Sequence, residues 1–184
     1  MPDLAGPKVA YLGYCGLIDA QGITRIAQML NSAVNEQFDS VYLCFSSAGG
    51  YVGDGIFLYN HIRSLPIPVT IHNTGTVASI AATLFVAADH RKCSQHSIFM
   101  MHPVATGASG ALSTDVLLAA LDSAQRDEAR TEAILRDRTR IPDEVLTARR
   151  TRDVYITAEQ ALQFGLAHDI ADFVLPPGNK IFQI

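Results

Sequence analysis

Short apolar segments alternate with segments of helical periodicity, and this alternation constrains the fold more than any other feature of the sequence. Residues 41–45 and 98–101 are apolar throughout, as expected of strands covered on both faces. Parallel strands need crossover connections of about a dozen residues, which are usually helical and right-handed. The pattern therefore predicts an α/β fold with a mostly parallel sheet. The expected strands are 9–12, 41–45, 69–73 and 98–101, and the expected helices are 19–35, 54–63 and 77–88.

The chain of 184 residues is long enough to enclose one hydrophobic core. No internal repeat, low-complexity block or linker divides it, so we expect a single domain over residues 1–184. Only 17% of the residues are charged, against about 25% in average soluble proteins, which favours an oligomer that covers extra apolar surface. The net charge of -4 argues against nucleic-acid binding, since that needs a basic face.

Neither a membrane protein nor a secreted protein is expected. The longest apolar stretch, residues 77–88, is shorter than the ~20 residues of a membrane span. The N-terminus has no basic region followed by an apolar one, as a secretory signal would have. The three cysteines form no C-x-x-C pair and are typical of a reducing compartment. We therefore expect a cytoplasmic protein that binds neither membrane nor nucleic acid.

The character of the sequence changes after His102. Residues 107–110 are all small, and a long helix is expected over 113–138. The first half of this helix carries apolar residues at helical spacing, and its second half is highly charged. The helix could project from the body and pack against a neighbour, or it could be an ordinary surface helix. Further on, the T-A-E-Q sequence that begins at Thr157 indicates a capping box, and Gly165 ends a short helix.

Gly49, Gly50 and Ser79 are candidates for a reactive site. The two glycines follow the strand expected at 41–45, at the edge where open α/β sheets bind ligands. Their N–H groups could hold an oxyanion, or the pair could form only a tight turn. Ser79 opens an apolar helix, where it could be a nucleophile or a helix N-cap. Its surroundings, V-A-S-I-A, lack the G-x-S-x-G elbow of the α/β hydrolases.

His102 and Asp153 could serve acid–base chemistry. His102 directly follows the strand expected at 98–101, so a rigid sheet would hold it at the cleft. Asp153 opens another strand candidate and could fix the tautomer of a histidine. Taken singly, a histidine at such a position is more often structural than catalytic, and an aspartate is more often an ordinary surface residue.

Residues 90–96 contain an H-x2-C-x2-H pattern that could suggest a metal site. A zinc site needs a further ligand or a defined open position, and Arg91 and Lys92 would repel a cation. A hairpin turn is the preferred interpretation, and no metal is expected. The nucleotide-binding patterns G-x-x-x-x-G-K-[ST] and G-x-G-x-x-G are both absent, so no nucleotide cofactor is expected either.

Taken together, these motifs resemble the proteolytic subunit of the caseinolytic (Clp) serine proteases. The resemblance spans about residues 9–170 and implies that Ser79 is the nucleophile, His102 the base and Asp153 the aspartate that orients the base. It also implies an oxyanion hole made by the backbone amides of Gly50 and Ile80, and it implies no cofactor. The motifs, in the family's order, are S-S-A-G-G at 46–50, G-T-V-A-S-I-A-A at 75–82, M-M-H-P at 100–103 and R-D-V-Y-I-T-A-E-Q-A at 152–161.

The same resemblance implies a ClpP/crotonase-like spiral of β-β-α units with a projecting handle over about 104–140. It further implies that the subunits form a homo-oligomer of stacked seven-membered rings, a closed barrel in which peptides or unfolded polypeptides are hydrolysed. Residues 107–110 and 113–138 would join the two rings. An AAA+ unfoldase would be the usual partner.

The sequence also departs from the family pattern. Ser46 and Ala48 stand where the family has asparagine and proline, and Ala81 replaces a glycine. The chain lacks most of the family's N-terminal segment, which argues against an unfoldase partner and for a stand-alone member. Two alternatives stay open, namely a non-catalytic ring subunit and a crotonase-fold acyl-CoA enzyme. A Ser–Lys protease is disfavoured because only Lys92 lies near the proposed site.

Overall fold

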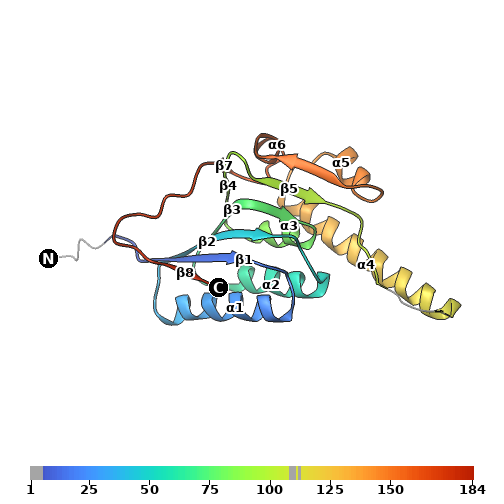
Figure 1. The fold of residues 1–184 in the computed structure, drawn as a ribbon, viewed down its shortest axis with the longest axis horizontal. Coiled ribbons are helices and arrows are strands. Elements are labelled where there is room, and N and C mark those ends of the chain that lie inside the picture. The colour runs from blue at the N-terminus through green and yellow to red at the C-terminus, as the bar shows by residue number, and fades with distance from the viewer. Residues whose placement is uncertain (1–5, 108–110, 112) are drawn as a thin grey trace.

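The strands form one eight-stranded sheet in the computed structural model, which describes residues 6–107, 111 and 113–184 (Figure 1). The strands are β1 (Val9–Cys15), β2 (Ser40–Ser47), β3 (Val69–Ala78), β4 (His90–Cys93), β5 (Ile98–Met101), β6 (Val154–Thr157), β7 (Asp169–Ile170) and β8 (Ile181–Gln183). Six of the strands lie side by side in the order β6-β5-β3-β2-β1-β8. The other two extend from β3, since β4 pairs with both β3 and β7. All pairs are parallel except β5–β6. The expected α/β fold with a mostly parallel sheet is confirmed.

Three helices lie on the same side of the sheet in Figure 1: α1 (Ala20–Asn35), α2 (Val52–Ser64) and α3 (Ile80–Phe85). Of these, α2 contacts both α1 and α3. The long helix α4 (Thr114–Arg138) is followed by two short ones, α5 (Asp143–Ala148) and α6 (Ala158–Gln163), on either side of β6 in the sequence. Within the described residues, no helix has both the length and the hydropathy needed to cross a bilayer.

The sequence explains where these helices begin and which face they bury. Asp19 caps α1, because its Oδ1 accepts a 2.7 Å hydrogen bond from the Gly22 N–H. Ile23, Ile26 and Leu30 then lie on the buried face of α1, as their spacing predicts. At α6, the expected capping box of Thr157 and Gln160 is confirmed.

Two expectations about the middle of the chain are wrong. The helix expected over 77–88 is confined to α3, because residues 76–78 pair with 98–100 and so stay extended as the end of β3. The hairpin expected near residues 90–96 does not form either. Both β4 and β5 pair in parallel with β3, with β4 along residues 70–73 and β5 along 76–78. A strand of ten residues is long enough to accept the two partners in succession.

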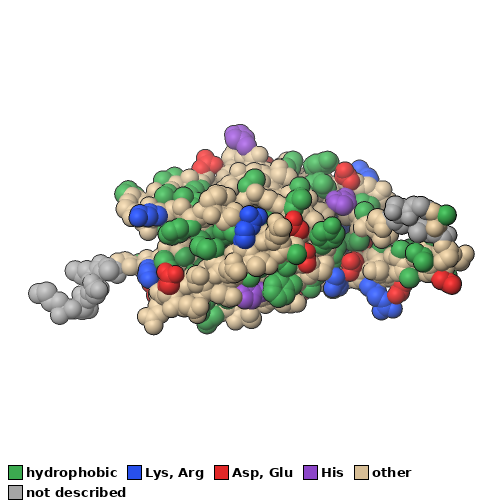
Figure 2. All heavy atoms as spheres, turned by 60° about the horizontal axis from the view of Figure 1, so that its bottom comes forward, with side chains coloured by type: hydrophobic (Ala, Val, Ile, Leu, Met, Phe, Trp, Pro, Cys, Tyr) green, Lys and Arg blue, Asp and Glu red, His purple; other side chains and the backbone are tan. Residues whose placement is uncertain are grey.

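Helix α4 projects beyond the sheet with its N-terminal half (Figure 1). Leu117, Leu118 and Leu121 on this half are each more than half exposed, and hydrophobic side chains gather at the projecting end in Figure 2. The N-terminal half of the helix therefore buries no face against the described part of its own chain, whereas the C-terminal half buries Thr131, Glu132 and Leu135. Residues 108–110 and 112, part of the expected ring contact, lie outside the described residues.

Arg91 on β4 is a buried cation that joins the C-terminal ends of three helices. Its Nη1 donates to the carbonyl of Val86 after α3 (3.3 Å), and its Nη2 donates to the carbonyls of Arg138 at the end of α4 (3.1 Å) and of Gly165 after α6 (3.0 Å). The side chain has no carboxylate partner among the described residues, and burial lowers the pKa of Arg91 to about 10. Carbonyls at helix ends carry partial negative charge and need donors. Arg91 supplies one donor to each of the three helices, and Arg138 Nε donates a second hydrogen bond, of 3.1 Å, to the Val86 carbonyl.

Replacing Arg91 by lysine should therefore destabilise the fold. The Val86 carbonyl keeps a second donor, Arg138 Nε at 3.1 Å, but an ammonium group cannot reach both of the other carbonyls, and each buried carbonyl left unpaired costs about 1–3 kcal/mol. We expect Arg91→Lys to lower the free energy of unfolding by about 2 kcal/mol or more, measured by urea denaturation. The matched control is Lys92→Met, which breaks an exposed 3.3 Å pair with Asp169 and should cost less than about 1 kcal/mol. Equal stability of the two variants would contradict the role of Arg91.

His168 should make the fold sensitive to acid. His168 is exposed at the surface, but partial burial, followed by the charge of Arg91, lowers its pKa, and its Nε2 lies 2.6 Å from Arg91 Nη2. Below the ordinary histidine pKa of about 6.5, the unfolded chain therefore binds more protons than the folded one, so stability is lost as the pH falls. We expect His168→Gln to flatten the decline of the free energy of unfolding between pH 6.5 and 5.5 by well under about 1.4 kcal/mol per pH unit, because solvent screens the charges around an exposed side chain.

The control is His96→Gln, which replaces an exposed histidine in the turn between β4 and β5. The slope of the free energy of unfolding against pH is compared between the two variants. His72, which is fully buried and also has a lowered pKa, adds a slope of the same sign, so the His168 variant should flatten the decline without abolishing it. A decline as steep as that of the wild type would show that His168 is not responsible.

Candidate active site

A cavity of about 200 Å³ opens where strands β2, β3 and β5 end. Ser79, His102, Gly50 and Ile80 all line it, and they come from three separate places in the sequence. Four of the five residues expected at the site therefore meet around one space. The fifth, Asp153, is exposed and is not among the lining residues.

Ser79 occupies the sharp turn between β3 and α3. Its backbone has φ 56° and ψ −131°, a left-handed conformation that is unusual for a residue with a side chain. Its N–H donates a 2.8 Å hydrogen bond to the Met100 carbonyl of β5, which holds the turn against the strand that leads to His102. The hydroxyl makes no capping hydrogen bond to α3. The helix N-cap interpretation of Ser79 is therefore not supported, and the hydroxyl faces the cavity free of that role.

The Gly49–Gly50 turn passes so close to its neighbours that side chains would not fit. Gly49 has φ +97°, and a Cβ there would lie 2.6 Å from Ser79 Cβ. A Cβ on Gly50 would lie 2.0 Å from the Ile18 carbonyl oxygen. Hydrogen bonds of 2.8 Å from Ile18 N–H to Gly49 O and from Tyr51 N–H to Ile18 O fix the turn. Among the described residues, the N–H groups of Gly50 and Ile80 have no hydrogen-bond partner, so both are free to bind an oxygen atom in the cavity.

His102 is half-buried directly after β5. Its Nδ1 lies 2.7 Å from the Pro103 carbonyl oxygen. Because a carbonyl can only accept, the hydrogen must be on Nδ1, and this leaves Nε2 as the acceptor of the neutral ring. That is the tautomer that a general base for a serine needs. No hydrogen bond joins Ser79 to His102 in the described part of the chain.

Asp153 lies across the β5–β6 ladder from His102. The antiparallel register pairs Met101 with Val154, so the next position along the ladder brings Asp153 opposite His102. Residues at this position are neighbours, with Cα atoms about 5 Å apart. The Asp153 carboxylate nevertheless makes no hydrogen bond or ion pair with any described residue, since the His102 Nδ1 is bonded to Pro103 instead.

The other walls of the cavity include residues that the motifs did not indicate. Apolar side chains of Val52, Ile80 and Met101 line it. So do Thr83 from α3, Thr131 and Leu135 from α4, and Arg149 from the turn after α5. The i, i+4 spacing of Thr131 and Leu135 within the charged half of the helix could have signalled an inward face. No sequence pattern pointed to Arg149.

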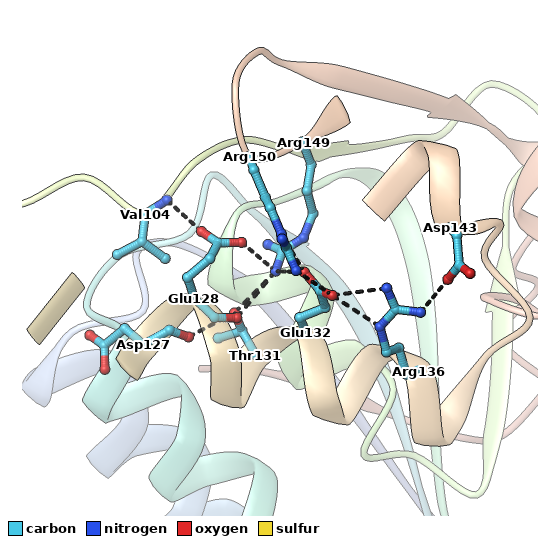
Figure 3. Close-up of polar contacts among 9 residues, drawn as sticks. All are labelled: Val104, Asp127, Glu128, Thr131, Glu132, Arg136, Asp143, Arg149 and Arg150. Carbon is cyan, nitrogen blue, oxygen red and sulfur yellow. Dashed lines mark hydrogen bonds and ion pairs between the residues drawn. The ribbon is translucent and has the colours of Figure 1, made fainter. Parts of the chain in front are cut away.

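A buried ionic network lies behind these walls and joins α4 to the segment that follows α5 (Figure 3). Glu132 accepts hydrogen bonds from Arg136 (2.9 Å) and from Arg150 (2.9 and 2.8 Å). Although burial opposes it, these hydrogen bonds lower the pKa of Glu132. Burial lowers the pKa of Arg149, against the opposing effect of Glu128. Arg136 also contacts Asp143, so α4 and α5 are held together.

The H-x2-C-x2-H pattern does not form a cluster. His90 and His96 are exposed, whereas Cys93 is buried, and Lys92 and Asp169 pair beside them. Among the described residues, no group of three or more histidine, cysteine, aspartate or glutamate side chains is placed to hold a metal ion.

Comparison with known proteins identifies the family of the chain. A family model described as Clp protease matches residues 15–173. The chain is 27% identical to the "ATP-dependent Clp protease proteolytic subunit 2" of Pseudomonas aeruginosa over 165 residues, 89% of this chain and 81% of that protein. It is 30% identical to "subunit 4" of Rhodococcus jostii over 166 residues, 89% of this chain and 84% of that protein. With "subunit 1" of Synechococcus sp. it shares 31% identity over 149 residues, 80% of this chain and 75% of that protein.

The family model covers most of the chain, and the sheet with its projecting helix is the ClpP/crotonase-like fold. The serine at a strained turn, the histidine at the end of the neighbouring strand and the free backbone amides all lie within the matched residues. The chain therefore belongs to the Clp protease family.

Proposed function

We propose that this chain is a serine-type endopeptidase in which Ser79 attacks the peptide carbonyl and His102 is the general base. One observation carries the proposal: Ser79, held at a strained turn, lines the same cavity as His102, Gly50 and Ile80. The backbone N–H groups of Gly50 and Ile80 make no hydrogen bond to any described residue. Family membership supports a peptidase role independently of this geometry.

In the proposed reaction, His102 Nε2 takes the proton of Ser79 Oγ as that oxygen bonds to the carbonyl carbon. The oxyanion that forms accepts hydrogen bonds from the N–H groups of Gly50 and Ile80. His102 then gives the proton to the leaving amine, and the acyl-enzyme is hydrolysed by water with the same roles reversed. The scheme uses no metal and no organic cofactor.

Asp153 contributes negative charge to this scheme. Opposite His102 on the ladder, its carboxylate stabilises the imidazolium that forms in the transition state and helps to orient the ring. The Pro103 carbonyl already keeps the hydrogen on Nδ1, so the correct tautomer does not depend on Asp153 alone.

The exposed leucines of α4 support assembly of the chain as a homo-oligomer, which we propose to consist of stacked heptameric rings. Leu117, Leu118 and Leu121 leave a hydrophobic face on the projecting helix, which another copy would cover. The proposed substrates are peptides or unfolded polypeptides that enter the closed barrel.

The names of the curated relatives describe ATP-dependent proteases. For this chain we propose hydrolysis of short peptides without an AAA+ ATPase, since a short peptide needs no unfolding. A cytoplasmic location stays a prediction.

The first test is hydrolysis of a short fluorogenic peptide by the purified protein without an ATPase. Ser79→Ala should lower kcat by at least about four orders of magnitude, because the nucleophile and base act as a unit. The matched control is Ser94→Ala: Ser94 also contacts a histidine, with its Oγ 3.1 Å from His72 Nε2, but it does not line the cavity. This variant should keep wild-type kcat. Equal activity of Ser79→Ala and wild type would exclude Ser79 as nucleophile.

An inactive wild type would favour the non-catalytic ring subunit, an alternative that the exposed position of Asp153 supports. Activity that appears only when an AAA+ ATPase and ATP are added would contradict the stand-alone expectation while leaving Ser79 in place.

Asp153→Asn should lower kcat by about 10- to 100-fold. This is less than the ~10⁴-fold loss in a triad whose tautomer depends on its aspartate, because Pro103 supplies that function here. The same peptide assay measures the effect, with Asp169→Asn, an exposed aspartate of β7, as the control. Unchanged kcat in Asp153→Asn would remove Asp153 from the mechanism.

A further inference from the structure

Glu128 on α4 reaches the segment that follows the proposed base (Figure 3). Its Oε2 accepts a 3.0 Å hydrogen bond from the backbone N–H of Val104. Val104 comes two residues after His102 and lines the same cavity as Ser79. The contact therefore fixes the backbone immediately beyond His102.

The peptide group between Pro103 and Val104 is held from both ends. Its carbonyl accepts the hydrogen bond from His102 Nδ1, and its N–H donates to Glu128. A peptide group is planar and rigid, so its C=O and N–H cannot turn independently. Whatever orients the N–H also sets the position of the oxygen that holds the His102 ring. Hydrogen bonds in such a series strengthen one another in a low dielectric.

Arg149 in turn holds Glu128. Its Nη2 lies 2.6 Å from Glu128 Oε1, an ion-pair contact, and its side chain is only 5% exposed. The other nearby carboxylate, that of Glu132, is 3.9 Å away. Arg149 also lines the cavity. A buried charge of this kind is strongly destabilising when it loses its partner, so Arg149 and Glu128 stay together beneath the Val104 segment.

Glu132, one helical turn further along α4, has a different set of partners. It binds Arg150 and Arg136 and makes no hydrogen bond to residues 103–105. It belongs to the same network, but it acts on the packing of α4 and not on the cavity wall. Comparing variants of the two glutamates therefore distinguishes a role at the proposed base, expected of Glu128, from a purely structural role, expected of Glu132.

We propose that Glu128 is a positioning residue for His102, acting through the Pro103–Val104 peptide group. With Arg149 behind it, the carboxylate holds that peptide so that its carbonyl keeps the hydrogen of the imidazole on Nδ1 and directs Nε2 toward Ser79. The inference rests on the proposed peptidase function.

Kinetics and hydrogen exchange of intact protein test the proposal. Glu128→Ala should lower kcat by at least about tenfold, because a small displacement of a reacting group is costly, with KM changed less than about threefold. Glu128→Gln keeps an acceptor for the Val104 N–H and should lose less. Hydrogen–deuterium exchange measured by mass spectrometry should show faster exchange of the peptide that contains Val104 in Glu128→Ala. The control is Asp127→Asn, in which this peptide should exchange as in wild type. Among the described residues, the Asp127 side chain pairs only with Arg130, on the surface of α4.

Further variants separate positioning from stability. Glu132→Gln should lower the melting temperature while leaving kcat within about threefold of wild type. If Glu128→Ala does not fold because Arg149 is left unpaired, the double variant E128L/R149M removes that charge and still loses the hold on Val104. Suppose that the activity of the wild type depends on Ser79. Then wild-type kcat in the folded Glu128 variants would overturn this inference but not the proposed function. Unchanged hydrogen exchange at Val104 would do the same. Absence of Ser79-dependent activity in the wild type would overturn the proposed function and the inference with it.

Discussion

A buried guanidinium that meets three helix ends is the constraint on which the rest of the structure depends. Arg91 donates to a carbonyl at the end of each of α3, α4 and α6, and no carboxylate partners it in the described part of the chain. Each of these helices serves the site: α3 starts beside Ser79, α4 forms a wall of the cavity, and α6 follows the strand that begins after Asp153. Because buried carbonyls must be hydrogen-bonded, moving α4 or α6 away from Arg91 leaves a carbonyl unpaired, whereas the Val86 carbonyl also accepts from Arg138 Nε. The parts of the site are thus held in one body.

The strain at Ser79 is local and is held by its neighbours. A non-glycine residue in a sparsely populated backbone region costs about 1–3 kcal/mol. Ser79 stays there because its N–H is bonded to β5 and because Gly49 lets the facing turn come within contact distance. Gly50 and Ile80, the residues that follow Gly49 and Ser79, line the same cavity. The strained turn and the close approach of Gly49 are consequences of a single arrangement of β2, β3 and β5.

The histidine is oriented by backbone in this structure. The Pro103 carbonyl holds Nδ1, and the same peptide group is bound on its other side by Glu128. Motif spacing located His102 and Ser79, since both directly follow apolar strands that end at one edge of a parallel sheet. The sequence indicated Asp153 only as a candidate, and the strand register is what brings it one ladder position from His102. The sequence did not reveal that the carboxylate is exposed, because a side chain's partner depends on which acceptor is nearest in space. Glu128 and Arg149 were missed for the same reason.

By itself, the sequence determined the α/β class and the helix starts at Asp19 and Thr157, and it indicated four of the residues that line the cavity. The class and the helix starts follow from local chemistry, namely hydrophobic period and capping side chains. Only the tertiary structure decided that residues 77–78 are strand and that β4 and β5 run parallel beside β3, because strand pairing outweighs the helical tendency of an apolar run. It also decided the partners of Arg91, Glu128 and His102. Such contacts join residues far apart in the chain, and their strength comes from burial, which no local pattern encodes.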